Sequence, residues 1–261
     1  MSVLDSIIEG VREDLAQRRL SMRQISEAMD QASPVRDPLA TLLASEMSII
    51  AEVKRSSPSK GRLAPITDPA ALAEEYALAG ATMISVLTER RHFAGSLDDL
   101  DAVRGRVDIP ILRKDFMVDE YQFFEARAHG ADVVLLIVAA LSHNQLNDYH
   151  QLALELGMRV VVEVHTYDEL ERALEISPEI VGVNSRNLKT LDVDSSAFAE
   201  LIPLLPHSLV RIAESGISSR ADVEFAQRHG ATAVLVGEVL VRADNSTLAM
   251  RELLGLGRLE A

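Results

Sequence analysis

The sequence predicts a single closed (β/α)8 barrel preceded by a helical extension. Short apolar segments alternate with amphipathic helical patterns, which is typical of parallel strands covered by helices. The stretches LAGATMISVL, AHGADVVLLI and RHGATAVLVG repeat one design, a helix end, a glycine and then an apolar strand. The chain has 261 residues, close to the roughly 250 that this fold usually needs.

Eight strands are expected, each short and rich in apolar residues. Runs such as VVLLIV are apolar on both faces, as strands buried beneath helices should be. The expected strands are residues 48–53, 82–87, 109–113, 133–138, 160–164, 180–184, 209–213 and 233–237. A doubly wound open sheet is the alternative, but no G-x-G-x-x-G turn follows the first strand.

Helical patterns separate these strands, and several open with a Ser, Asp or Thr that can cap a helix. They cover residues 68–79, 119–129, 142–156, 166–176 and 219–229. Gly80, Gly130 and Gly230, with Gly157 in a looser copy, stand where a helix ends in a backbone of positive φ. Residues 3–19 carry a separate apolar stripe, so we expect an N-terminal helical extension over 1–45 and the barrel over 46–261.

Composition narrows the class of protein. The formal net charge of −14 argues against nonspecific nucleic-acid binding, and no apolar run is long enough to span a membrane. The chain contains no cysteine, which excludes disulfides, thiolate metal sites and a cysteine nucleophile. We expect a cytoplasmic protein that binds a small molecule through a few locally placed groups.

Polar side chains gather where the expected strands end, and in this fold the active site lies at that edge. Glu52 and Lys54 close the first strand at i and i+2, so both project from one face. The opposite loops, GATM, GADV, GMRV and GATA, lack such groups. The other strand ends carry Leu112, Lys114 and Phe116, then Glu163, Asn184, Arg186, Glu214, Ser215, Gly237 and Glu238.

Glu163 is the sharpest single candidate, because it lies among valines in VVVEV. Burying an unpaired carboxylate costs roughly several kcal/mol, so Glu163 requires a positively charged partner. Lys54 and Lys114 are the expected partners. A mixed-charge cluster in a dry pocket can tune pKa values for general acid–base catalysis.

Glycine-containing loops after the last two strands predict a phosphate site, as is frequent in these barrels. Gly216 in ESGIS and Gly237 in VGEVL have the required position, and Ser57 can close the site from the first strand. Glu238 fits beside a phosphate only if its backbone N–H binds while its side chain points away.

The chain resembles the indole-3-glycerol phosphate synthase family over essentially its full length. The matching stretches are IAEVKRSSPSKG, SVLTERRHFAGSLDDL, ILRKDFMVDEYQ, GADVVLLIVAAL, VEVHTYDEL, VGVNSRNLKTLDVD, AESGIS and VLVGEVLVR. The resemblance implies a TIM barrel lyase of tryptophan biosynthesis. Its substrate would be 1-(2-carboxyphenylamino)-1-deoxyribulose 5-phosphate, closed to an indole with loss of CO2 and water.

The resemblance also implies roles. Lys114 would be the general acid at the substrate ketone and Glu163 the acid/base of the dehydration. Lys54, held by Glu52, resembles the family lysine at the substrate carboxylate, as a binder or as a second acid. The remaining implied roles are positioning by Asn184 and Arg186, pocket lining by Glu214 and Ser215, an apolar wall from Leu112 and Phe116, and phosphate binding at Ser57, Gly216, Gly237 and Glu238.

Neither a metal nor an organic cofactor is expected, since no His/Asp/Glu set has zinc-like spacing. His92, His143, His165 and His207 are expected to be loop or helix residues. The alternatives are a phosphoribosyl isomerase, a Schiff-base aldolase using Lys114 or Lys54, and a binding module on a barrel that has lost its activity. The sequence leaves open a weak homodimer and contacts with other enzymes of the pathway.

Overall fold

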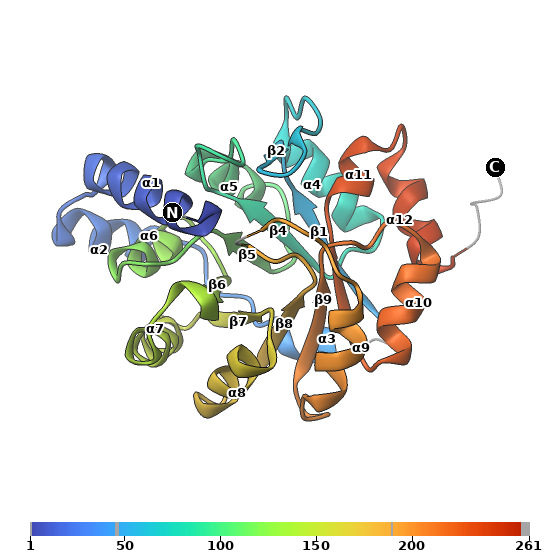
Figure 1. The fold of residues 1–261 in the computed structure, drawn as a ribbon. Helices are drawn as coiled ribbons and strands as arrows, with labels where there is room; N and C mark the ends of the chain where they lie inside the picture. The colour runs from blue at the N-terminus through green and yellow to red at the C-terminus, as the bar shows by residue number, and fades with distance from the viewer. Residues whose placement is uncertain (1, 45–46, 189, 257–261) are drawn as a thin grey trace.

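The computed structural model describes residues 2–44, 47–188 and 190–256. Within them, eight parallel strands close into a barrel in the order β1-β10-β9-β8-β7-β6-β5-β4 (Figure 1). The strands are β1 Ser48–Val53, β4 Met83–Leu87, β5 Ile111–Lys114, β6 Val133–Ile137, β7 Arg159–Val164, β8 Ile180–Asn184, β9 Val210–Glu214 and β10 Ala233–Val236. The predicted (β/α)8 barrel is confirmed, and the open sheet is excluded because β1 pairs with both β10 and β4.

Helices surround the barrel (Figure 1). They are α4 Pro69–Leu78, α5 Leu97–Arg104, α6 Tyr121–Ala128, η1 Val138–Ala140, α7 His143–Glu155, α8 Tyr167–Glu175, α9 Ser196–Leu201, η2 Ile202–Leu204, α10 Arg220–Arg228, α11 Glu238–Arg242 and α12 Ser246–Leu254. Asp68, Ser142, Thr166 and Ser219 are N-caps whose side chains accept backbone hydrogen bonds, as predicted. No helix in the described ranges is long and apolar enough to cross a membrane.

The predicted helix-ending glycines are confirmed by their backbone conformation. Gly80, Gly130, Gly157 and Gly230 have φ values of 103°, 75°, 81° and 100°. A side chain is strained in this region, so glycine lets the chain leave the helix and enter the next strand directly.

Three helices precede β1: α1 Val3–Arg18, α2 Met22–Gln31 and α3 Leu39–Ala44. Leu4, Ile7 and Val11 of α1 are buried in the main core, and α2 packs beside α6 (Figure 1). Arg91, in the loop after β4, forms ion pairs with two carboxylates of α1. The predicted boundary at 45–46 lies outside the described residues, so the division into two units stays a prediction.

Six strands differ from their predicted ranges by one or two residues, and the differences at β5 and β9 matter for the site. Strand β5 starts at Ile111 because Pro110 has no N–H to donate, and it extends to Lys114. Strand β9 starts at Val210 and includes Glu214. Lys114 and Glu214 therefore lie on the sheet itself, where strand pairing fixes their backbone.

Candidate active site

A cavity of about 790 Å³ opens at the carboxyl ends of the strands. All the predicted site residues except Leu112 line it, from β1, β5, β7, β8, β9 and β10 or the loops that follow these strands. They are Glu52, Lys54, Ser57, Lys114, Phe116, Glu163, Asn184, Arg186, Glu214, Ser215, Gly216, Gly237 and Glu238. The barrel thus brings together side chains as far apart in sequence as Glu52 and Glu238.

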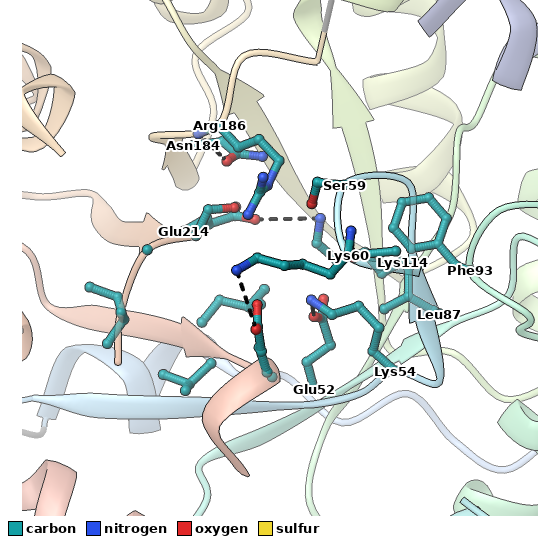
Figure 2. Close-up of a pocket in the computed structure, with 18 of the residues that line it drawn as sticks. Glu52, Lys54, Ser59, Lys60, Leu87, Phe93, Lys114, Asn184, Arg186 and Glu214 are labelled. Carbon is teal, nitrogen blue, oxygen red and sulfur yellow. Dashed lines mark hydrogen bonds and ion pairs between the residues drawn. The ribbon is translucent and has the colours of Figure 1, made fainter. Parts of the chain in front are cut away.

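Glu52 and Lys54 form an ion pair at the end of β1 (Figure 2). Glu52 is buried, whereas the Lys54 ammonium reaches the cavity. A Cβ built on Gly237 would lie 2.5 Å from Glu52 Oε1, so only glycine there leaves room for the carboxylate. The pairing also corrects one expectation, because the partner of Lys54 is Glu52 and not Glu163.

Lys114 extends from β5 between two buried carboxylates. Its Nζ lies 3.3 Å from Glu163 Oε2 and 3.5 Å from Glu214 Oε2. Burial by itself lowers the pKa of Lys114, but the charges of Glu163, Glu214 and Glu52 outweigh burial and raise the pKa above its ordinary value. Lys114 is therefore a protonated ammonium at neutral pH, as predicted for a general acid.

The two carboxylates differ in pKa. Burial raises the pKa of Glu214 to about 8, against the opposing charge of Lys114 and with help from the charge of Glu163. Burial also raises the pKa of Glu163, but the charges of Lys114 and His165 and a hydrogen bond from Asn184 lower this pKa below its ordinary value. One protonated and one ionised carboxyl group thus flank one cation, an arrangement typical of acid–base sites.

Gly182 of β8 makes room for this arrangement. It pairs with Glu163 across the β7–β8 ladder, and a Cβ at this position would overlap the Glu214 carboxylate. Both oxygens of Glu214 are buried without a hydrogen-bond partner in the described part of the chain, and one of them lies 3.5 Å from the Lys114 ammonium. Buried polar atoms are normally satisfied, so these oxygens mark a place where a ligand can bind.

The end of β8 and the loop after β9 form the adjoining wall. Asn184 Oδ1 accepts a 2.9 Å hydrogen bond from the Arg186 backbone N–H, and Arg186 Nη1 donates to the Leu191 carbonyl at 2.9 Å. Ser215 and Gly216 have φ values of 66° and 73°. For Ser215 this backbone conformation is uncommon, and such strain clusters at functional sites.

The predicted phosphate residues, Ser57, Gly216, Gly237 and Glu238, also line the cavity. Ser57 is in β2 Ser56–Ser57, which forms a short hairpin with β3 Gly61–Arg62 in the segment expected as a loop. Lys60, from the hairpin turn, extends over the cavity (Figure 2) and lies 3.8 Å from Glu238 Oε1. Arg242 Nη1 lies 3.4 Å from the same oxygen. The Glu238 side chain therefore lines the cavity and does not point away from it, which corrects the expectation.

The apolar wall also differs from the prediction. Leu112 is fully buried and is not among the described residues that line the cavity, because it lies two residues below Lys114 on β5. Leu87, Phe93 and Phe116 form the wall, with the two phenylalanine rings 6.2 Å apart. Ile7 of α1 also lines the cavity; its only signal in the sequence was the apolar stripe of that helix.

Sequence reasoning also missed His165. It was expected to be one of several scattered loop or helix histidines, and it does lie in a loop, between β7 and α8. Its ring is buried, however, with Nε2 3.4 Å from Glu163 Oε1. The position at i+2 from Glu163 was the available signal, since both side chains then project from one face.

The fold and the site together define an enzyme of the TIM barrel class, with an acid–base cluster at the carboxyl ends of its strands. The family model of indole-3-glycerol phosphate synthase matches residues 4–253. Two curated relatives with that name come from Kineococcus radiotolerans and Streptomyces coelicolor. They are 54% and 52% identical to this chain, and each match covers 98% of this chain and 96% of the relative. The chain therefore belongs to the indole-3-glycerol phosphate synthase family.

Solved structures agree on the fold. The 3-hexulose-6-phosphate synthase from Salmonella typhimurium superposes with a TM-score of 0.65 at 13% identity, covering 80% of this chain and 98% of that one. The thiamine phosphate pyrophosphorylase from Pyrococcus furiosus superposes with a TM-score of 0.61 at 16% identity, covering 82% and 96%. At these identities the likeness concerns the barrel alone.

Proposed function

We propose that this cavity converts 1-(2-carboxyphenylamino)-1-deoxyribulose 5-phosphate to indole-3-glycerol phosphate, CO2 and water. The observation that carries the proposal is the Lys114 ammonium held between Glu163 and Glu214 inside the cavity. Membership of the synthase family supports the same reaction, a decarboxylating carbon–carbon lyase of tryptophan biosynthesis.

Ring closure comes first and uses Lys114 as general acid. The aromatic carbon that bears the carboxylate attacks the ketone carbon, and Lys114 donates its proton to the ketone oxygen, which becomes a hydroxyl group. The C–CO2 bond then breaks, and its electron pair restores the aromatic ring. Lys54, held by Glu52, balances the charge of the substrate carboxylate before it leaves as CO2.

Dehydration follows and uses Glu163 as the acid/base. The new hydroxyl group leaves as water with a proton, and the methylene carbon beside the nitrogen loses a proton, which forms the indole double bond. Glu163 lies beside Lys114, so it reaches the same part of the substrate. Asn184 and Arg186 position the substrate hydroxyls and carboxylate in this proposal, and Leu87, Phe93 and Phe116 contact the aromatic ring.

The phosphate binds in this proposal at Ser57, Gly216, Gly237 and the backbone of Glu238. Lys60 and Arg242 already lie beside the Glu238 carboxylate, so two cations are within reach of a second anion there.

The aldolase alternative fits the site less well. A Schiff-base lysine must be a neutral amine to attack a carbonyl, and its pKa is therefore depressed. The carboxylates beside Lys114 raise its pKa instead, and the Lys54 ammonium is paired with Glu52. Both lysines suit acid catalysis or anion binding, and borohydride with substrate should trap neither.

Indole fluorescence tests the proposal directly, because the chain contains no tryptophan. Mixing the protein with the carboxyphenylamino-deoxyribulose phosphate should produce a rise in indole emission. Tight binding of the substrate without this rise would indicate a binding module on an inactive barrel. The absence of both binding and indole emission would favour the isomerase alternative.

The expected cytoplasmic location stays a prediction that cell fractionation can check.

A further inference from the structure

A buried histidine lies behind Glu163, and the proposed mechanism does not use it. His165 is the first residue after β7, and its side chain is 7% exposed. It is not among the described residues that line the cavity, so it does not touch the substrate space. Of the cavity residues, Glu163 is the one that the His165 ring faces at ion-pair distance.

Glu169 fixes the orientation of the His165 ring. Thr166 caps α8 by accepting the Glu169 backbone N–H, which holds Glu169 in the first turn of the helix. From there Glu169 Oε2 accepts the His165 backbone N–H at 2.7 Å and lies 3.1 Å from His165 Nδ1. A carboxylate at this distance requires a proton on Nδ1, so Nε2 is the nitrogen that faces the barrel.

His165 Nε2 lies 3.4 Å from Glu163 Oε1, within ion-pair distance, and neither atom has a hydrogen-bond partner in the described ranges. Without a proton between them, a lone pair on nitrogen would face a carboxylate oxygen in a buried site, which is unfavourable. A single proton on either group removes this repulsion, giving imidazolium and carboxylate or imidazole and carboxylic acid.

The surrounding charges favour the ion pair. The charged and titratable groups that act on the pair are Lys114 from β5, Glu214 from β9 and Glu169 from α8. Burial lowers the pKa of His165, but Glu169 and Glu163 outweigh burial and raise it above its ordinary value. Burial raises the pKa of Glu163, but Lys114 and His165 lower it.

We propose that His165, oriented by Glu169, is a positioning residue that holds Glu163 in place and keeps it ionised between turnovers. The imidazolium occupies Glu163 Oε1 and leaves Oε2, the oxygen beside Lys114, for the substrate. This inference rests on the proposed function, because it acts through the assigned role of Glu163 in the dehydration.

The substitution His165→Gln tests the proposal, because it keeps a polar side chain but removes the charge. The acid limb of the kcat–pH profile should move up by about 1–3 pH units, the usual effect of one nearby opposite charge on a carboxyl group. Below the displaced limb kcat should fall by roughly 10-fold for each pH unit of displacement, while KM stays within about twofold, since the substrate contacts are intact.

Two further variants separate positioning from a structural role. Glu169→Gln should move the acid limb in the same direction by less, and the double variant should match His165→Gln, because Glu169 acts through His165. His143→Gln is the matched control, since His143 pairs with Glu175 on the surface, far from the cavity lining, and its profile should equal that of the wild type. An unmoved acid limb, with kcat falling only as thermal stability falls, would overturn the proposal.

An NMR titration of the free protein decides the pairing without any turnover. The His165 imidazole, assigned by its absence in His165→Gln, should titrate about 1–3 pH units lower in Glu163→Gln than in the wild type. An unchanged midpoint would overturn the pairing. If the wild type makes no indole product, the proposed function fails, and this titration still decides whether His165 and Glu163 share a proton.

Discussion

Two buried charge clusters lie on opposite faces of one strand, β5. Arg113 points outward and is fully buried under α6, whereas Lys114 points into the barrel, because successive residues of a strand face opposite sides. The outer cluster consists of Arg18, Arg113 and Glu125, and Arg113 also pairs with Asp115, which lines the cavity. The inner cluster consists of Lys114, Glu163 and Glu214.

The clusters differ in how well their carboxylates are satisfied. Glu125 accepts hydrogen bonds from both Arg18 and Arg113, and Asp115 accepts from Thr88 Oγ1 at 2.6 Å and from the Phe116 backbone N–H at 2.8 Å. In the inner cluster both Glu214 oxygens lack a hydrogen-bond partner in the described part of the chain. A saturated network stabilises one structure, and an unsaturated one retains capacity for a ligand. Substitutions in the two clusters should therefore damage different properties.

The largest effect is expected for Lys114→Ala. Loss of the general acid should lower kcat by about 10²–10⁴-fold or more, measured by indole fluorescence. Arg106→Ala removes an exposed ion pair with Glu74 and is the control, with turnover like that of the wild type. Unchanged turnover in Lys114→Ala would contradict the assignment of the acid.

Arg113→Met should instead reduce stability. Removing one partner from a buried ion cluster costs about 3–5 kcal/mol of unfolding free energy, because Asp115 and Glu125 lose hydrogen bonds. Urea unfolding followed by circular dichroism measures this loss. Turnover per folded molecule should fall far less than in Lys114→Ala; an equal fall would show that the two faces of β5 do not separate stability from catalysis.

The pH dependence of stability should reveal Glu214. Its folded pKa of about 8 lies above its ordinary value of 4.5, so between these values the folded state holds a proton that the unfolded state has lost. The stabilisation that this proton gives the folded state is complete below the ordinary pKa of 4.5 and is lost as pH rises through about 8. The variant Glu214→Gln has no carboxyl group at this position to titrate. Between pH 5 and 8.5 its free energy of unfolding, measured in urea, should therefore rise relative to that of the wild type by on the order of 3 kcal/mol. Parallel stability curves for the two proteins would contradict the raised pKa.

The smallest effect is expected at the phosphate end, from Glu238→Ser. Removing the carboxylate frees Lys60 and Arg242 and takes a negative charge away from the bound phosphate. KM should fall by roughly 2–10-fold, the scale of one exposed charge contact, with kcat nearly unchanged. Steady-state kinetics at two ionic strengths measures this, and a KM that rises would mean that Glu238 itself helps to bind the substrate.

Much of the site could be predicted because local patterns determine it. Apolar runs, helix caps and the glycines at helix ends located each strand, and the polar residue at each strand end then had to lie at the barrel mouth. This reasoning reached Lys114, Glu163 and Glu214 without any knowledge of their contacts, because their place depends on the strand that carries them.

The partners of these residues depended on the tertiary structure. Strand register pairs Gly182 with Glu163 and leaves room for Glu214, and the capped first turn of α8 turns His165 toward Glu163. The helix α1 adds Ile7 to the cavity from outside the barrel. Local patterns were enough to predict which residues reach the active-site edge, because secondary-structure period and capping depend on neighbouring residues. Only the closed barrel decided which charges meet, because those contacts join strands that are far apart in the chain.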